Sequence, residues 1–108
     1  MKKNEQIEVN VYVENIVNDV NALLRTSSVP WHCFYNCSAE WGQVGVWVLL
    51  RSYTTIVAAY NAETDELFDF LRLVYGYTAT GAQHIAKFRV YCRSVTGHDC
   101  TMYRWYAV

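Results

Sequence analysis

Three successive runs of β-forming residues, joined by short links, constrain the fold of this chain more than any other feature of its sequence. The runs cover residues 43–50, 55–60 and 67–75. Residues 51–54 are predicted to form a turn or bend, and residues 61–65 are short and polar, as in a hairpin loop. Strands joined by links this short pair with their neighbours in opposite directions. The sequence therefore predicts an antiparallel meander of three strands.

An apolar stripe at helical spacing predicts a helix before the meander. The stripe consists of Val13, Ile16, Val17, Val20, Leu23 and Leu24. We expect this helix to end within residues 26–28, because Pro30 disfavours helical geometry at the residue before it. Residues 5–12 are open to two interpretations, since they continue the stripe but also alternate as in a β-strand. We prefer a helix that begins near Glu8.

A second helix is predicted to begin at Thr80 and to end before Gly97. Residues 80–83 match a capping box, in which the Thr80 hydroxyl accepts a hydrogen bond from a backbone amide and the Gln side chain reaches back. One face of this helix carries Gly81, Ile85, Phe88, Arg89 and Cys92. Residues 101–108 are expected to form a terminal strand, whereas residues 31–41 have no clean period and are expected to be a connection.

The length of 108 residues predicts a single domain, residues 1–108. The order of elements predicts the α+β class, with an antiparallel sheet of about four strands and two helices packed on one face. Apolar residues make up 53% of the chain, with one Pro and five Gly, which excludes a disordered or low-complexity segment.

The chain shows no targeting segment. Its N-terminal residues turn polar where a signal peptide would be apolar, and the longest apolar run, residues 44–50, is too short to cross a membrane. We therefore expect a cytoplasmic protein, in the host cell if the source is viral, with no membrane partner. Reduced thiols are expected in that compartment.

Charge is divided unevenly along the chain. Residues 1–71 carry four basic and nine acidic side chains, and residues 72–108 carry five basic and one acidic side chain, so the two balances are −5 and +4. Two interpretations stay open: an ordinary solvated surface, or a local positive face for an anionic partner. The overall net charge of −1 argues against a polycationic nucleic-acid coat, so DNA binding is not expected.

The turn into the second predicted helix carries the candidate ligand-binding residues. They are Tyr75, Tyr77, Thr78, Thr80, Gly81, His84 and Lys87, with Arg89 and Arg93 farther along the helix. A helix N-terminus offers unpaired amides, Gly81 leaves the backbone approachable, and a tyrosine ring can stack on a base. This pattern predicts a site for an anionic nucleotide-type ligand. The alternative is that the cap satisfies the same amides within the chain and that His84 bonds to a neighbour.

The sequence predicts no metal, no cofactor and no catalytic site. Side chains of the types that bind zinc occur at His32, Cys33, Cys37, His98 and Cys100, but their spacing is not that of a standard zinc site. We expect the cysteines to behave as small apolar residues, and a metal held by Cys33, Cys37 and Cys100 stays the alternative. The usual catalytic motifs, such as HExxH and GxSxG, are absent, so we expect a protein that is not an enzyme.

Residues 51–88 carry a pattern that resembles a known group of proteins. The pattern is SYxTxVA, then a tyrosine-bearing turn, then TxxxHIxxF, and it is formed by Ser52, Tyr53, Thr55, Val57, Ala58, Tyr77, Thr80, His84, Ile85 and Phe88. It resembles a family of small uncharacterised proteins carried by phages and mobile elements of gut anaerobes. The resemblance implies a small mobile-element protein and assigns no chemistry to its residues.

Two hypotheses for the function follow, and both place the protein in counter-defence, that is, evasion of host immunity. In the first, the protein binds without turnover and sequesters an anionic nucleotide-type signal. In the second, it inhibits or regulates a host defence protein such as a nuclease effector by direct binding, as anti-CRISPR proteins do. Aromatic residues make up 16% of this small chain, which predicts exposed aromatic surface and hence a homo-oligomer.

Overall fold

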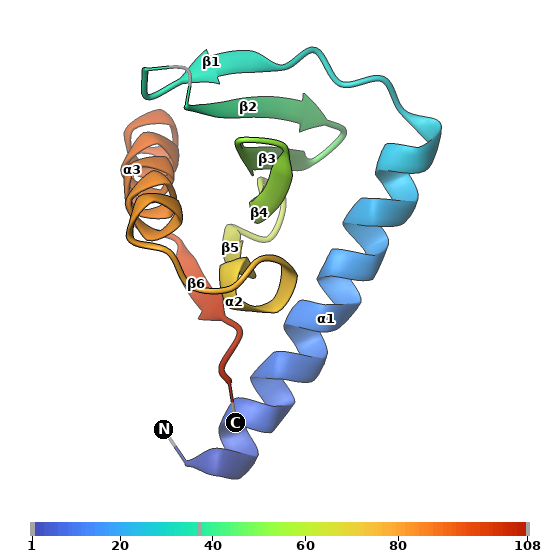
Figure 1. Ribbon diagram of the computed structural model, residues 1–108, viewed down its shortest axis with the longest axis vertical. Coiled ribbons are helices and arrows are strands. Elements are labelled where there is room, and N and C mark those ends of the chain that lie inside the picture. Colours follow the sequence, from blue (N-terminus) through green and yellow to red (C-terminus); the bar gives the residue numbers. More distant parts are fainter. Residues whose placement is uncertain (1, 37, 108) are drawn as a thin grey trace.

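A six-stranded mixed sheet lies between two long helices (Figure 1). The computed structural model describes residues 2–36 and 38–107. In chain order the elements are α1 (Lys3–Thr26), β1 (His32–Phe34), β2 (Ala39–Val44), β3 (Trp47–Ser52), β4 (Thr55–Asn61), β5 (Glu66–Asp69), α2 (Leu71–Val74), α3 (Ala79–Thr96) and β6 (Thr101–Arg104). The α+β class is therefore confirmed, while the sheet is larger than the four strands expected.

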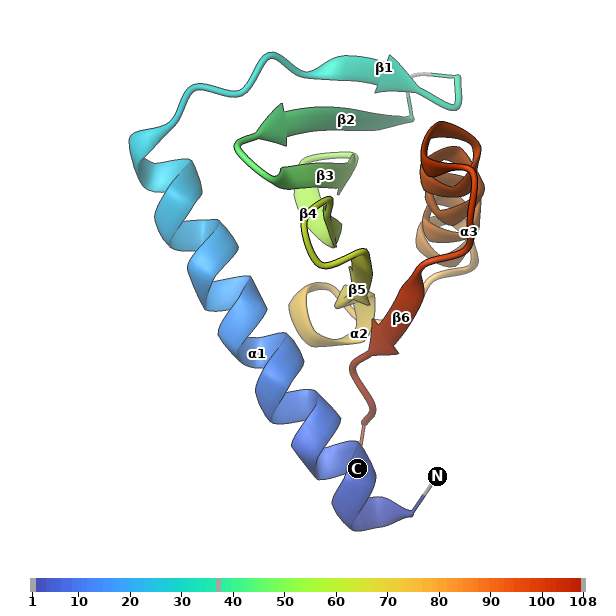
Figure 2. The ribbon, with the colours of Figure 1, turned by 180° about the vertical axis from the view of Figure 1, so that it is seen from behind.

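The strands lie side by side in the order in which they occur along the chain. Each pair from β1 to β5 is antiparallel, which confirms the central meander, but β6 pairs with β5 in the parallel direction. Between those two strands the chain passes through α2 and α3 and returns to the same end of the sheet, and a connection of this kind gives parallel pairing. The expectation of a purely antiparallel sheet was wrong for this reason. Figure 2 shows β6 at the edge of the sheet, followed by the C-terminus.

The apolar run that begins near residue 43 contains a turn that its composition concealed. Val44 pairs with Trp47 across the turn, Gly45 has a φ of +58°, and Val46 is exposed. A single predicted strand is therefore two, β2 and β3. Residues 31–41, expected to be a connection, supply β1 and the start of β2. Two of the three residues of β1 are exposed, so this edge strand has no apolar alternation that a sequence pattern could reveal.

The third predicted strand is shorter than expected, because β5 ends at Asp69 and one helical turn follows. The Asp69 Oδ1 atom accepts a hydrogen bond from the Leu71 amide at 3.1 Å, and the Phe70 amide donates to the Val57 carbonyl at 3.1 Å. These two bonds turn the chain out of the sheet at Phe70. The residues after it form α2, and its first residue, Leu71, is buried.

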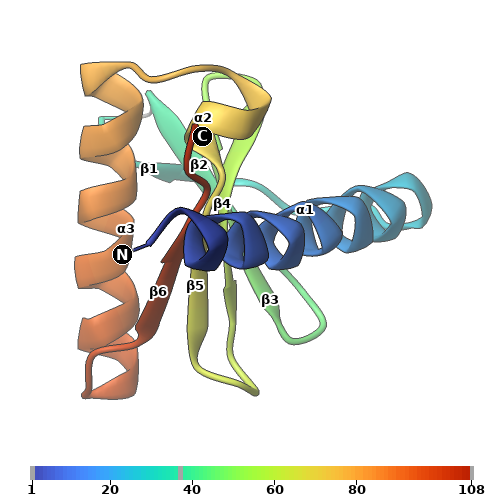
Figure 3. The same ribbon diagram turned by 90° about the horizontal axis from the view of Figure 1, so that it is seen from below.

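The core has two layers, one on each face of the sheet. Adjacent residues on the central strands point to opposite faces, and both members are apolar in Leu49 and Leu50, Ala58 and Ala59, and Leu67 and Phe68. The first layer packs under α3 and the second under α1. Both faces therefore need a cover, so the expectation that both helices pack on one face was wrong. Figure 3 shows that the two helices also run in different directions.

α1 is one continuous helix from Lys3 to Thr26, so residues 5–12 are helical and the helix begins before Glu8. Its end at Thr26 was predicted correctly. The buried stripe consists of Asn10, Val13, Val17 and Val20, whereas Ile7 and Val11, which suggested a strand, are exposed. Although α1 has 24 residues, neither it nor any other helix in the described part of the chain is long and apolar enough to cross a membrane.

A polar contact joins α1 to the C-terminal segment. The Asn10 Nδ2 group donates to the Tyr106 carbonyl at 2.6 Å, and the Tyr106 amide donates to Asn10 Oδ1 at 2.7 Å. Asn10 thereby satisfies both backbone groups of Tyr106, as a neighbouring strand would. The predicted terminal strand over residues 101–108 is confirmed only as far as Arg104.

Candidate anion-binding pocket

The N-terminus of α3, where the sequence predicted a phosphate site, is capped within the chain. The N-cap residue is Thr78, whose Oγ1 accepts from the Gly81 amide at 3.0 Å, so the predicted capping box that begins at Thr80 was wrong. Thr78 has the extended backbone of an N-cap, and α3 has already begun at Ala79. Gly81 is buried, and a Cβ atom there would lie 2.9 Å from Leu71 Cδ1. Gly81 therefore allows α3 to pack closely on α2, and its amide is already bonded.

His84 is buried inside the fold and links α3 to the end of β3 and to the turn that precedes β2. Its side chain is 1% exposed, its Nδ1 lies 2.8 Å from Ser52 Oγ, and its Nε2 lies 3.0 Å from Ser38 Oγ. The Ser38 hydroxyl donates to the Tyr35 carbonyl, which assigns the Nε2 proton to the bond with Ser38 and leaves Nδ1 to accept from Ser52. Burial lowers the pKa of His84. The ring is a structural link and does not face a ligand.

The other predicted residues are divided among separate parts of the surface. Tyr75, Thr78 and Thr80 line a small cavity of about 140 Å³ together with Ser52 and Tyr53. The Lys87 ammonium lies 5.2 Å from the centre of the Tyr35 ring, beside the loop that joins β1 and β2. Arg93 lies in a shallow depression with Arg89. The structure therefore does not unite the predicted set in one site.

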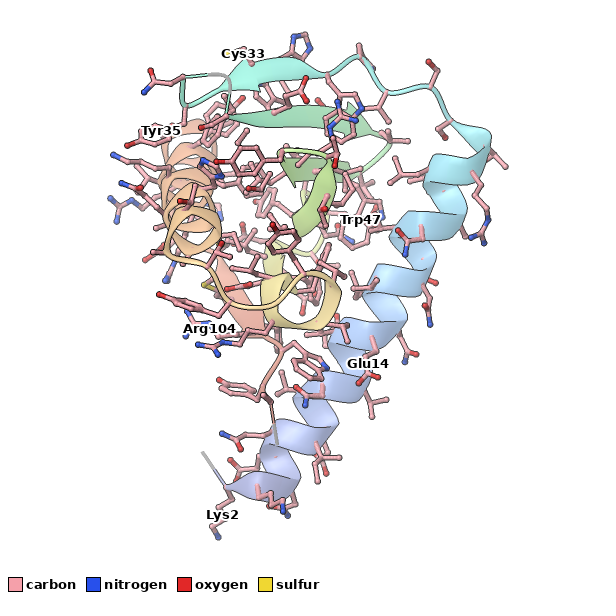
Figure 4. All side chains as sticks on the ribbon, viewed as in Figure 1. Lys2, Glu14, Cys33, Tyr35, Trp47 and Arg104 are labelled. Atoms are coloured by element: carbon pink, nitrogen blue, oxygen red, sulfur yellow. The ribbon has the colours of Figure 1, made fainter. Side chains whose placement is uncertain are left out.

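A larger cavity, of about 470 Å³, lies between α3, β6 and the segment that contains α2. Its lining, which we call the arginine pocket, consists of Asp69, Leu71, Arg72, Tyr77, Ala82, Ile85, Ala86, Arg89, Met102 and Arg104. β6 is the last strand of the sheet, so no further strand covers this flank of α3. Figure 4 places Arg104 on the side of the molecule where α3 and β6 lie. Of the predicted site residues, only Tyr77 and Arg89 line this pocket.

Asp69 is the one carboxylate in the lining, and it is already bonded on both oxygens. Oδ1 accepts from the Leu71 amide, and Oδ2 lies 3.4 Å from Arg104 Nε. Burial raises the pKa of Asp69, while the Leu71 amide and Arg104 act in the opposite direction. Asp69 and Arg104 are direct partners in the parallel register of β5 and β6, so the pairing of the strands places them together.

The three arginines of the pocket keep hydrogen-bond donors for a ligand. Arg104 to Asp69 and Arg89 Nε to Asp99 Oδ1 are ion pairs of 3.4 and 3.5 Å, longer than the usual distance for charge-assisted bonds. By contrast, Arg51 reaches Glu40 with two nitrogens, at 2.8 and 3.1 Å. The Arg72 guanidinium lies 4.7 Å above the Tyr77 ring, and no carboxylate of the described residues forms an ion pair with it.

Sequence reasoning missed Arg72 and Arg104 as site residues, although the charge count included both. They are separated by all of α3, and only the return of the chain along β5 brings them together. The uneven charge was thus a usable signal for the region. The helix N-terminus was a misleading signal for the position, because its cap is internal.

The cysteines and histidines weighed as an alternative zinc site have separate environments where the structure describes them. Cys92 and Cys100 are free and buried, whereas Cys33 is disulfide-bonded, which corrects the expectation of reduced thiols for that residue. Cys37 lies outside the described residues. His98 pairs with Asp65 at 2.8 Å. Over residues 2–36 and 38–107, no group of three or more His, Cys, Asp or Glu side chains is arranged to hold a metal ion.

The arrangement as a whole is suited to holding an anion. Three arginines line one cavity together with the apolar side chains of Leu71, Ile85 and Met102 and with Tyr77, which is exposed. Planar guanidinium groups match phosphate and carboxylate with paired hydrogen bonds. Comparison of the chain with protein-family models, with curated proteins and with solved structures finds no match.

Proposed function

We propose that this protein binds an anionic nucleotide-type ligand in the arginine pocket, without turnover, and that it acts as a counter-defence protein of a phage or mobile element in the host cytoplasm. The observation that carries the binding proposal is the convergence of Arg72, Arg89 and Arg104 on one cavity of about 470 Å³. Cavities of roughly 300–1,000 Å³ are typical of small-molecule sites. The resemblance of residues 51–88 supports a mobile-element source, and the counter-defence role is our hypothesis for a protein from such a source.

The chemistry of the lining supports a phosphate together with a base. Arg89 and Arg104 are positioned on two sides of the cavity, from α3 and β6, so a phosphate between them receives donors from both. The Tyr77 side chain is 58% exposed, which leaves ring surface on which a base can stack. Because Asp69 is bonded to Leu71 and Arg104, its repulsion of an anion is partly neutralised.

Calorimetry with mono-, di- and cyclic nucleotides tests this proposal. Losing a charged contact to phosphate costs about 2 kcal/mol, so Arg89→Ala and Arg104→Ala are each expected to weaken binding about thirtyfold. Arg25→Ala is the matched control, because it removes the same charge from the exposed last turn of α1, which packs on the opposite face of the sheet. That variant is expected to bind within about twofold of the wild type.

Two results would contradict the proposal. One is that no nucleotide binds more tightly than about 1 mM, which corresponds to about −4 kcal/mol. The other is that Lys87→Ala weakens nucleotide binding more than Arg89→Ala does. That result would place the binding site on the part of α3 near Tyr35 and not in the arginine pocket. Circular dichroism of each variant shows whether the fold is retained.

The second hypothesis, inhibition of a host defence protein, is favoured by a different surface. Tyr53 and Tyr75 are 63% and 64% exposed and line the same small cavity, and exposed aromatic residues dominate protein-binding hot spots. A phage-protection assay separates the two hypotheses. Loss of protection in Tyr53→Ala and Tyr75→Ala, with Arg89→Ala still protective, would support a protein target.

Light scattering tests the expected homo-oligomer against the 12.5 kDa monomer.

A further inference from the structure

Two shallow depressions share lining residues with the arginine pocket. The first is lined by Arg89, Val90, Arg93 and Asp99, and the second by Gln6, Arg72, Arg104, Tyr106 and Ala107. Arg89 belongs both to the first depression and to the pocket, and Arg72 and Arg104 belong both to the second and to the pocket. The three hollows therefore adjoin one another through shared arginines, and together we call them the arginine groove.

The arginine groove carries positive charge along its whole length. Four arginines line it against two carboxylates, Asp69 and Asp99. Within the described part of the chain no carboxylate forms an ion pair with Arg93 at one end, and none with Arg72 toward the other. At a rise of 1.5 Å per residue, Arg93 lies about 6 Å along the α3 axis from Arg89, which lines both the pocket and the first depression. Arg93 therefore lies one helical turn beyond the arginine that faces the pocket.

Rings also occur at more than one position along the groove. Tyr77 stands at the pocket and Tyr106 in the second depression, where Asn10 holds its backbone. Cationic side chains that follow a backbone, combined with aromatic rings on which successive bases stack, are the features by which proteins bind single-stranded nucleic acid. A nucleic-acid strand carries one phosphate per nucleotide, so its charges repeat along a line.

We infer that the ligand of the proposed site is a short single-stranded oligonucleotide of two or three nucleotides. One phosphate lies in the pocket against Arg89 and Arg104, and a neighbouring phosphate lies in the first depression against Arg93. This inference rests on the proposed function and narrows it, because a mononucleotide fills the pocket and leaves Arg93 unused.

Calorimetry with 5′-phosphorylated deoxyadenosine ligands of one, two and three nucleotides tests the inference. The wild type is expected to bind the longer ligands at least about tenfold more tightly than the mononucleotide. Arg93→Ala is expected to remove that gain while changing mononucleotide affinity less than about twofold, and Arg25→Ala is expected to change neither. The dependence of affinity on salt should steepen by about 0.7 in log–log slope for each added phosphate that is neutralised.

The possible failures can be told apart. If all three lengths bind equally, or if Arg93→Ala weakens all of them equally, the inference is wrong and the nucleotide site in the pocket stands. If no length binds, both the inference and the proposed function are wrong. If a hexaglutamate peptide binds as tightly as the trinucleotide, the groove recognises acidic peptide and the inference is overturned.

Discussion

Replacing Asn10 with Ala removes the two hydrogen bonds that join the backbone of Tyr106 to α1. These bonds measure 2.6 and 2.7 Å, and Asn10 is 5% exposed. Each intramolecular bond contributes about 1 kcal/mol net, and leaving the Tyr106 amide and carbonyl without partners adds to the cost. We therefore expect Asn10→Ala to lower the free energy of unfolding by about 2–3 kcal/mol, which is a large part of the roughly 5–15 kcal/mol typical of a domain.

The variant Asn10→Asp tests the donor role of Nδ2 on its own. A carboxylate still accepts from the Tyr106 amide, but it turns a second oxygen toward the Tyr106 carbonyl. The folded state then disfavours the charged form, so the pKa of this new carboxyl is raised on folding. The free energy of unfolding should be lower than that of the wild type at pH 7, and the difference should narrow as the pH falls through the raised pKa, where the protonated acid can donate.

Urea unfolding followed by tryptophan fluorescence, at pH 7 and at pH 4, measures both effects. Asn18→Ala is the matched control, because Asn18 lies on the exposed face of the same helix, and it should change stability by less than about 0.5 kcal/mol. The reasoning is refuted if Asn10→Ala costs no more than this control, or if the deficit of Asn10→Asp is independent of pH.

Three further predictions concern buried residues of α3. Burial lowers the pKa of His84 from its ordinary value of 6.5, so the folded state binds fewer protons than the unfolded state. The free energy of unfolding should therefore fall as the pH drops below 6.5. In urea titrations from pH 7.5 to 5, the free energy of unfolding of His84→Gln should depend less steeply on pH than that of the wild type. In Gly81→Ala the new Cβ would lie 2.8 Å from Thr78 Oγ1. This crowding should outweigh a gain of about 1 kcal/mol in helix propensity and lower the melting temperature. A melting temperature at or above that of the wild type would contradict the close packing of α2 and α3. Burial raises the pKa of the Cys92 thiol to about 12, so iodoacetamide should label this residue slowly in the native protein and quickly in urea. Peptide mass spectrometry measures the labelling, and rapid labelling of the native protein would disprove the burial of Cys92.

Local patterns in the sequence determined the elements that depend on neighbouring residues. The stripe that includes Val13, Val17 and Val20 predicted the helix whose buried side is now seen, and Pro30 predicted its end. The short polar link at residues 61–65 predicted a hairpin, and β4 and β5 pair across it. These signals act within a few turns or strand residues, so they can be recognised before the fold is known.

Signals that matched more than one structure led to errors. Thr78 and Thr80 both carry a hydroxyl that can cap a helix, and the choice of cap depends on which of them has the extended backbone. Residues 44–50 are apolar apart from Gly45, and the pairing of Val44 with Trp47 shows that this glycine lies in a turn. A continuous apolar run has no period, so composition cannot locate its interruptions.

The arginine pocket was decided by tertiary structure alone. The sequence determined that positive charge is concentrated after Leu71, but Arg72, Arg89 and Arg104 meet only because β6 returns parallel to β5 and α3 packs across the same face. That packing follows from a sheet whose central strands are apolar on both sides, which requires a helix on each face. Contacts between residues far apart in the chain set the order of the strands and place Arg104 opposite Asp69. A local sequence pattern cannot predict such contacts.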